Sequence, residues 1–410
     1  MHLTPPTSLD RAVIDARHPG PLGVAVSGGG DSLALLRLLI AEAGLSLQVA
    51  TVDHAIRPES IGEAQEVGKI CADLGLDHTI LPWEGWDGTG NLQDQARRAR
   101  KSLISNWARS RGIASVALGH TADDQAETFL IRLARGSGLD GLAAMEPVTT
   151  DHGIQWLRPL LHLRRTQLRD YLRGIGQQWT DDPSNDDPKF ARVRMRKALD
   201  KLEPLGIDVP EIAQTTARLR SAKQVLFAAT KDLAELAATL TPLGEIRLDT
   251  ERVQSAQQSV RLRLVSEALR FVSGSYYAPR AFTVEELIAG FGEAFMGASL
   301  HGCLIRREGA HIHIRREPAH VEGPARPGAL WDNRWLVTGP DDGADCTVSA
   351  LGEAGLAQCP DWRETGHRRE SLLTTPGVWR DATLISAPMA GYCRNWTSTF
   401  TPQSPFFTHA

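Results

Sequence analysis

The sequence contains few cysteines and no long apolar run, and each absence excludes a class of protein. Its five cysteines are scattered over 410 residues and form no Cys-x-x-Cys pair, so we expect no disulfide framework, zinc site or iron–sulfur site. No stretch of about 18 consecutive apolar residues occurs, so no membrane span is expected. The first residues also lack the positive region and apolar core of a secretory signal. These absences predict a protein of the reducing cytoplasm.

Acidic and basic residues nearly balance. The formal net charge of −4 argues weakly against nucleic-acid binding through net charge alone. Basic residues nevertheless cluster in three segments, 94–111, 158–169 and 192–201. One such segment is most simply a solvated helix face, but three within one domain predict a patch for a polyanion. Apolar residues make up 42% and charged residues 23%, as in soluble globular proteins, and the length predicts two or three domains.

Short apolar runs and amphipathic stretches alternate over the first 160 residues. They predict strands at 23–26, 47–52, 78–81 and 115–118 and helices at 33–43, 59–74, 94–111 and 122–134. This order predicts an α/β fold in which a parallel sheet is covered by helices on both faces. Ligands of such sheets bind beyond the carboxyl ends of the strands. We expect Ser27, Asp53 and His120 to converge there, because each follows one of the predicted strands.

The pattern changes after residue 203. Long helices are predicted at 212–238 and 253–271, a hairpin at 299–307 with 310–316, a Pro- and Gly-rich linker at 317–327, and strand-like runs at 334–337 and 383–387. We therefore predict three domains. They are an α/β domain at 1–203, a mainly helical domain with the hairpin at 204–318, and a small α+β domain at 319–410.

A glycine-rich loop follows the first predicted strand and leads into the first predicted helix: Ser27-Gly28-Gly29-Gly30-Asp31-Ser32. Glycines allow positive φ angles and let the backbone approach a ligand closely. Their N–H groups and the free amides at the start of the helix form a site for an anion such as phosphate. The hydroxyls of Ser27 and Ser32 can donate further hydrogen bonds to phosphate oxygens. The loop therefore predicts a site for the phosphates of a nucleotide.

Two commoner nucleotide-binding loops are excluded by single residues. A Walker A loop needs Gly-Lys-Ser or Gly-Lys-Thr after the glycines, and the dinucleotide-binding motif needs a glycine where Leu33 stands. Asp31 would repel a bound pyrophosphate unless Mg²⁺ lay between them. The loop belongs to neither common class, and it predicts a site that binds phosphates together with Mg²⁺.

The pattern Ser-Gly-Gly-x-Asp-Ser after a strand resembles the PP-motif of the N-type ATP pyrophosphatases, which transfer AMP to a carbonyl-like oxygen and release pyrophosphate. Further motifs are Asp53-His54, then His120-Thr121-Ala122-Asp123-Asp124-Gln125-Ala126-Glu127 with a glycine-rich loop from Arg135, and then Asp182-Pro183-Ser184-Asn185 ahead of Arg192-Val193-Arg194. Together these resemble the tRNA(Ile)-lysidine synthetases. The resemblance is close from residue 20 to 200 and weaker in the last domain. Val193 stands where that family usually has Asn.

The resemblance implies an adenine-nucleotide alpha-hydrolase-like fold and an ATP-dependent ligase. Members of that family attach L-lysine to C2 of the wobble cytidine of tRNA(Ile) with a CAU anticodon, which changes codon reading from AUG to AUA. ATP is the implied second substrate and Mg²⁺ the implied cofactor. The two later domains are expected to bind the tRNA, without an obligate protein partner.

Roles for the matching residues follow from their charge and position. ATP is expected to contact Ser27, Gly28, Gly29, Gly30, Asp31, Ser32, Asp53 and His54. Asp31 and Asp124 are the candidates for holding Mg²⁺, and with His120 they form the expected catalytic set. Lysine and tRNA are expected to contact Asp123, Glu127, Arg135, Arg192 and Arg194. The group that deprotonates the lysine amine is left open among His120, Asp123, Asp124 and Glu127.

Other interpretations remain for single residues and for the whole chain. Asp53, His54 and His120 could serve only as hydrogen-bonding groups at strand and helix ends, and Asp182–Asn185 could be an ordinary turn. A tRNA-thiolating enzyme on the same scaffold would need reactive cysteines, but the first domain contains only Cys71. A GMP or asparagine synthetase would need a glutamine amidotransferase domain. A non-catalytic nucleotide- or tRNA-binding module would be expected to lack the acids at the site, which are present.

Overall fold

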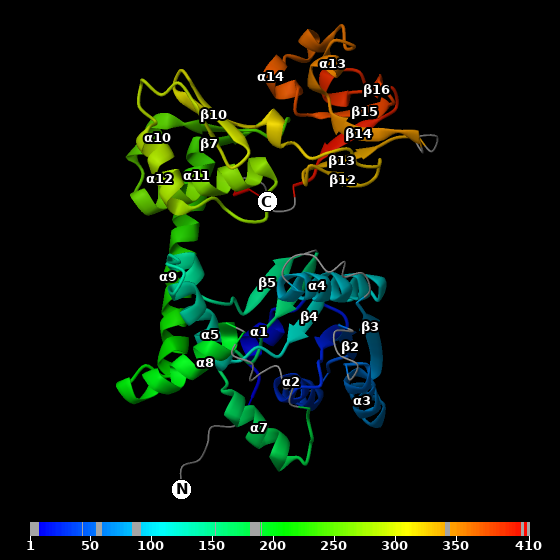
Figure 1. Ribbon diagram of the computed structural model, residues 1–410, viewed down its shortest axis with the longest axis vertical. Coiled ribbons are helices and arrows are strands. Elements are labelled where there is room, and N and C mark those ends of the chain that lie inside the picture. Colours follow the sequence, from blue (N-terminus) through cyan, green and yellow to red (C-terminus); the bar gives the residue numbers. More distant parts are fainter. Residues whose placement is uncertain are drawn as a thin grey trace. The chain divides into compact units, whose positions relative to one another are not determined.

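The structure is a computed structural model of the chain. It describes residues 8–42, 44–54, 60–83, 92–151, 153–180, 189, 191–340, 345–402 and 406–407. The chain forms two compact units, Met1–Lys223 and Gln224–Ala410 (Figure 1). None of the helices in the described ranges combines the length and the apolar character that a bilayer span requires.

The first unit is built on a six-stranded sheet with the strand order β3-β2-β1-β4-β6-β5. All of its strands run parallel except β5, which pairs antiparallel with β6 at one edge. The strand order changes direction between β1 and β4, which is the point at which ligands of such sheets bind. The strands are β1 (Leu22–Ala25), β2 (Leu47–Asp53), β3 (Asp77–Pro82), β4 (Ser115–Leu118), β5 (Val148–Asp151) and β6 (Ile154–Leu157).

Helices cover both faces of this sheet, as the sequence predicts (Figure 1). On one face α1, α2, α3 and α7 pack in one hydrophobic cluster with Val24 and Val49. On the other face, Trp107 of α4 packs with Ala25. Successive strand residues point to opposite faces, so Val24 and Ala25 contribute to different clusters. The helices are α1 (Arg11–Asp15), α2 (Gly30–Ala41), α3 (Ser60–Asp73), α4 (Leu92–Ser110), α5 (Ala122–Leu133), α6 (Leu139–Leu142), α7 (Arg165–Gly174), α8 (Ala191–Leu202) and the 3₁₀ turn η2 (Glu203–Leu205).

The predicted strands and helices of this unit are confirmed, and their ends differ by at most three residues. Helix α2 begins at Gly30 rather than at residue 33, because the end of the glycine loop already forms its first turn. The sequence does not predict β5, β6 or α7. Each of these two strands has four residues, and α7 buries only Leu168 and Leu172, so their apolar patterns are too short to stand out.

The second unit contains a five-stranded antiparallel sheet with the order β7-β8-β11-β10-β9. The predicted hairpin turn is confirmed, since β10 and β11 pair from Cys303 opposite Arg316 to Glu308 opposite His311. The arm predicted at 299–307 is divided, however, because β9 ends at Leu300 and β10 begins at Cys303. The single helix predicted at 253–271 is wrong, because Ala256 and Gln257 have extended backbones that separate α10 from α11. The elements are α9 (Val209–Ala237), which begins in the first unit, β7 (Ala238–Leu240), β8 (Ile246–Asp249), α10 (Thr250–Ser255), α11 (Gln258–Ser273), α12 (Ala281–Ala289), β9 (Ala298–Leu300), β10 (Cys303–Glu308) and β11 (His311–Arg316).

Two three-stranded sheets, β12-β13-β17 and β14-β15-β16, follow in the same unit. The stretch predicted as a linker is partly structured, since it contains the turn η3 and Ala325 pairs with Val348. The elements are η3 (Pro318–His320), β12 (Leu330–Trp331), β13 (Trp335–Thr338), β14 (Thr347–Ala350), α13 (Gly352–Leu356), η5 (Trp362–Thr365), α14 (Arg369–Leu372), β15 (Pro376–Arg380), β16 (Thr383–Ser386), η6 (Pro388–Ala390) and β17 (Thr397–Phe400).

A buried ion cluster connects β11 to the turn between β12 and β13. The Asp332 side chain is fully buried and pairs with two arginines, Arg316 (Nη2 to Oδ1, 2.7 Å) and Arg334 (Nη2 to Oδ2, 2.8 Å). Arg316 also donates to the carbonyl oxygens of Gly302 and His320. Two charged partners and these hydrogen bonds satisfy groups that would otherwise be costly to bury.

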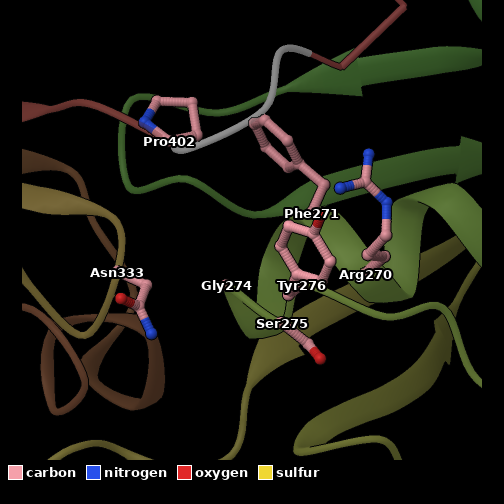
Figure 2. Close-up of a pocket in the computed structure, with 7 residues that line it drawn as sticks. All are labelled: Arg270, Phe271, Gly274, Ser275, Tyr276, Asn333 and Pro402. Carbon is pink, nitrogen blue, oxygen red and sulfur yellow. The ribbon is translucent and has the colours of Figure 1, made fainter. Parts of the chain in front are cut away.

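A small pocket in the second unit lies at the end of α11, opposite the β12–β13 turn (Figure 2). It contains none of the residues expected to bind ATP, lysine or Mg²⁺. Its lining residues are Arg270, Phe271, Gly274, Ser275, Tyr276, Asn333 and Pro402.

Each of the five cysteines is a free thiol. The side chain of Cys393 is exposed, and those of Cys71, Cys303, Cys346 and Cys359 are buried.

Candidate active site

The candidate site lies at the carboxyl ends of three neighbouring parallel strands. Ser27 follows β1, Asp53 ends β2 and His120 follows β4, and β1 pairs with both β2 and β4. The three residues therefore lie at the same edge of the sheet, beside the point where the strand order changes direction.

The glycine loop presents free backbone amides at the start of α2. Gly28 has a φ of +86°, which is a left-handed conformation that favours glycine. Gly29 caps α2 without any side-chain hydrogen bond. Ser32 Oγ donates to Gly29 O (2.9 Å) and accepts from Ser27 N (3.1 Å), so it fixes the loop from inside. The amides of this first turn and the positive end of the helix dipole can bind an anion.

Gly119 allows the end of β4 to pack directly on the start of α2. A Cβ atom at this position would lie 3.0 Å from both Asp31 O and Ser32 Cα. Any larger residue would therefore separate the two segments or displace the glycine loop. This close contact brings the helix after β4 next to the loop.

The two adjacent acids at the start of α5 have different partners. Thr121 caps the helix and donates from its N and Oγ1 atoms to Asp124 Oδ2, both at 2.9 Å. This capping leaves Asp124 Oδ1 facing Arg165 and Arg192, at 3.6 and 3.9 Å. Asp123 instead accepts from Arg165 N (2.7 Å), at the start of α7, and pairs with Arg164 (3.4 Å). Asp124 is thus the one of the two that faces the site.

Asp31, Asp124 and Glu127 form an acidic cluster around one arginine. Arg165 contacts Asp31 Oδ2 through Nε (3.0 Å), Asp124 Oδ1 through Nη2 (3.6 Å) and Glu127 Oε1 through Nη1 (3.5 Å). The sequence predicts the three acids but gives Arg165 no role. The available signal was its place in the basic segment 158–169.

Glu127 is the most buried member of the acidic cluster, with 1% of its side chain exposed. Its Oε1 atom accepts from Arg196 Nε (3.2 Å) and Nη2 (3.1 Å). Its Oε2 atom is buried without a hydrogen-bond partner among the described residues. Burial raises the pKa of Glu127, and the nearby charge of Asp124 adds to this effect against the opposing arginines.

The two aspartates respond differently to the same surroundings. Burial raises the pKa of Asp31, although Arg165 opposes the change. Burial alone would also raise the pKa of Asp124, but the neighbouring imidazole of His120, the charges of Arg165 and Arg192 and the hydrogen bond from Thr121 N lower it overall. Asp124 is therefore ionised at neutral pH.

Both histidines at the site are held neutral. Burial lowers the pKa of His120 to about 3, and its Nδ1 atom has no hydrogen-bond partner among the described residues. Burial and the charge of Arg100 likewise lower the pKa of His54, whose ring lies edge-on to Trp83 with 5.9 Å between centroids. The neighbouring Asp53 accepts a hydrogen bond from Ser60 Oγ (2.6 Å).

Three other expected contact residues differ in position. Arg192 approaches Asp124, with 43% of its side chain exposed. Arg194 is exposed and donates to Lys189 O (2.8 Å), and Arg135 is exposed just beyond α5. Val193 is buried, so its apolar side chain fits the position it occupies. Asp182–Asn185 lies outside the described residues.

The acids at the site provide some of the ligands that a hard cation such as Mg²⁺ needs. No group of three or more His, Cys, Asp or Glu side chains able to hold a metal ion is found within the described ranges. Mg²⁺, however, is commonly bound by one or two carboxylates together with substrate phosphates and water. Asp31 and Asp124 provide two such carboxylates beside the phosphate-binding loop, and the cation now between them is the guanidinium of Arg165.

The chain is similar to known proteins over most of its length. The family model described as a PP-loop domain matches residues 6–203. The chain is 43% identical over 396 residues to a tRNA(Ile)-lysidine synthase of Ruegeria pomeroyi, covering 95% of this chain and 93% of that protein. It is 32% identical over 387 residues to a tRNA(Ile)-lysidine synthase of Wolbachia pipientis wMel, covering 90% and 89%.

Among solved structures, the likeness to the U34-tRNA thiolase NcsA of Methanococcus maripaludis is distant. The identity is 18%, the TM-score is 0.43, and the match covers 51% of this chain and 76% of that one. The two sequence relatives, in contrast, are matched over nearly their whole length. The chain therefore belongs to the tRNA(Ile)-lysidine synthase family.

Proposed function

We propose that this chain uses ATP to join L-lysine to C2 of the wobble cytidine of tRNA(Ile) with a CAU anticodon. One observation carries the proposal: the glycine loop, whose amides at the start of α2 receive no side-chain cap, lies beside the acidic cluster at one edge of the sheet. The loop suits the phosphates of ATP, and the cluster suits a cation and an amine. Membership of the family supplies the RNA substrate and the nucleophile.

The reaction requires that a poor electrophile be activated first. The C2 carbonyl of cytidine is urea-like, and transfer of AMP to its oxygen turns that oxygen into a good leaving group. The bond between the α- and β-phosphates of ATP breaks, and pyrophosphate leaves with the negative charge that develops. The amides of Gly30, Asp31 and Ser32, in the first turn of α2, would stabilise that charge.

Asp31 and Asp124 are the residues that would hold Mg²⁺. When bound, Mg²⁺ neutralises phosphate charge during the departure of pyrophosphate. Asp124 is suited to this role because its pKa is lowered, so it is ionised at neutral pH. The remaining ligands would come from phosphate oxygens and water.

Lysine must then attack C2 through its neutral ε-amine, and AMP leaves with the electron pair of the C2–O bond. The attacking amine loses one proton to a base. Among the open candidates, Glu127 is the best matched, because burial raises its pKa toward neutrality and its Oε2 atom has no hydrogen-bond partner among the described residues. His120, with a pKa of about 3, is a weaker base.

Thiolation of tRNA is disfavoured by the chemistry of Cys71, the one cysteine in the sequence of the first unit. It is buried within α3, and burial raises its pKa to about 11. Sulfur transfer needs a thiolate that can be reached. We place the enzyme in a reducing cytoplasm, in keeping with its five free thiols.

The direct test is incubation of the purified chain with ATP, labelled lysine and a tRNA(Ile) transcript with a CAU anticodon. We expect pyrophosphate release, AMP formation and label in the tRNA. A transcript with the wobble cytidine replaced by uridine is the matched control and should gain no label. Absence of label in the CAU transcript despite pyrophosphate release would exclude lysine as the nucleophile.

The variant Asp31→Asn tests the proposed role of this carboxylate in the same assay. It removes the carboxylate charge beside the loop, so pyrophosphate release should be suppressed while tRNA affinity is nearly unchanged. Loss of tRNA affinity in this variant would instead indicate that Asp31 supports the structure.

A further inference from the structure

Arg165 is the first residue of α7 and contacts all three members of the acidic cluster. Its Nε atom lies 3.0 Å from Asp31, and its two terminal nitrogens lie 3.6 Å from Asp124 and 3.5 Å from Glu127. Its side chain is only 19% exposed. Its backbone is fixed as well, because Arg165 N donates to Asp123 Oδ2 at 2.7 Å.

The surroundings of Arg165 explain why a cation is needed there. Three carboxylates are gathered from α2 and α5, and Glu127 and Asp124 are almost completely buried. Arg192 and Arg196 approach the cluster from α8, and Arg164 pairs with Asp123 beside it. Like charges at this spacing repel one another strongly when they are removed from water. A planar guanidinium carries five donors spread over three nitrogens in a fixed geometry, whereas the ammonium of lysine carries three donors on a single nitrogen.

The guanidinium also lies between the two carboxylates that would hold Mg²⁺. Its contact with Asp31 is the shortest of the three. A free Mg²⁺ ion would have to displace it while giving up bound water, which Mg²⁺ does reluctantly. Mg²⁺ that arrives on ATP brings phosphate ligands, and these favour the exchange.

We propose that Arg165 is a positioning residue that keeps the acidic cluster assembled before the nucleotide binds and excludes free Mg²⁺ from it. This inference rests on the proposed function only in taking Asp31 and Asp124 as the Mg²⁺ ligands. Arg165 acts through these acids.

Thermal unfolding of the full chain with and without MgCl₂, in the absence of nucleotide, tests the proposal. The Tm of the wild-type chain should be unaffected by Mg²⁺. Arg165→Met should have a lower Tm, and Mg²⁺ at about ten times its Kd should raise that Tm by about 3 °C. In the double variant Arg165→Met/Asp31→Asn the Mg²⁺ effect should disappear, because one of the two ligands is lost.

Arg164→Met is the matched control. It removes the same charge from the adjacent position, where the partner is Asp123 and not the acidic cluster, so Mg²⁺ should leave its Tm unchanged. An equal Mg²⁺ shift in the wild type and in Arg165→Met would overturn the proposal. So would the absence of any shift in Arg165→Met.

If Arg165→Met does not fold, Arg165→Lys replaces it, because lysine keeps the charge but has one nitrogen in place of the three that Arg165 directs at the three acids. A Mg²⁺ shift larger than that of the wild type supports the proposal, and an equal shift overturns it. Binding of Mn²⁺ followed by electron paramagnetic resonance gives a direct count of bound ions in the same variants. None of these measurements contains tRNA or lysine, so failure of lysine incorporation would affect the proposed function and not this result.

Discussion

The two carboxylate oxygens of Glu127 have different surroundings. One carboxylate oxygen is paired with Arg196 and Arg165, and the other is buried without a partner among the described residues. A buried polar atom without a hydrogen bond is costly. An incoming amine would satisfy it, which is why we regard Glu127 as a group that meets the substrate rather than one that supports the fold.

Glu127→Gln is therefore expected to separate the two half-reactions. Pyrophosphate release should persist, because the phosphate-binding loop is untouched, while lysine incorporation should fall by about 10²- to 10⁴-fold through loss of the base. Both rates are measured on the same preparation. Glu66→Gln, at an exposed pair with Lys69 in α3, should change neither rate. Equal losses in both half-reactions of Glu127→Gln would refute a role confined to lysine.

The raised pKa of Glu127 also gives a pH dependence. As the pH falls through its folded pKa, which lies above the ordinary value of 4.5, the carboxylate is protonated and lysine transfer should slow. Burial disfavours the ionised form, so protonation of Glu127 stabilises the folded chain. This stabilisation is fully present below the unfolded pKa of Glu127 and is lost as the pH rises through its folded pKa. Acid should thus slow lysine transfer without unfolding the chain through this group. Incorporation rates and circular dichroism across the same pH range check this, and coincident loss of activity and fold would contradict it.

At the scale of single elements, the start of α2 and the end of β4 depend on one another. Gly119→Ala would place a methyl group 3.0 Å from the backbone of Asp31 and Ser32, so one segment must move. We expect the KM for ATP to rise by about tenfold or more, since small displacements of a positioned substrate have large effects.

Gly62→Ala is the control for this prediction. Gly62 lies in α3, and a Cβ atom there meets nothing within 4 Å. Ala at such a site should stabilise the helix by about 0.4–1 kcal/mol and leave ATP binding unchanged. Steady-state kinetics with ATP varied compare the two variants, and a normal KM in Gly119→Ala would show that the contact can relax.

The strands β1 to β4 and the helices α2 to α5 of the first unit could be predicted, because each has a clear apolar run or an amphipathic stretch between turn residues. The glycine loop and the acids after β4 were equally local signals. The role of Arg165 was not predictable, because its partner Asp31 is 134 residues away in sequence and no local pattern connects them. The choice between Asp123 and Asp124 needed the structure too, since it depends on which acid completes the cap of α5 and which reaches α7.

At the scale of the whole molecule, the three predicted domains stay a prediction. The contacts divide the chain into two units, and the second contains both the five-stranded sheet and the two smaller sheets. The segment 317–327, which the sequence predicts as a linker, is not free of such contacts, because its residue Ala325 pairs with Val348 of β14. The ion pair between Asp332 and Arg316 also connects the end of β11 to the β12–β13 turn.

Asp332→Ala is expected to destabilise the second unit by about 3–5 kcal/mol, because it leaves Arg316 and Arg334 buried without their partner. Urea unfolding followed by circular dichroism measures the change. Glu353→Ala removes an acid from an exposed pair with Arg369 and should cost no more than about 1 kcal/mol. Similar costs in the two variants would show that the buried ion cluster contributes little.

The distribution of thiols has a practical consequence for these experiments. Burial raises the pKa of Cys71 to about 11 and that of Cys303 to about 12, and Cys346 and Cys359 are also buried. Cys393, beyond η6, is the exposed thiol of the native chain. A maleimide dye should therefore react at one position without any engineered cysteine, and a change in its fluorescence on addition of tRNA would test whether the second unit binds RNA.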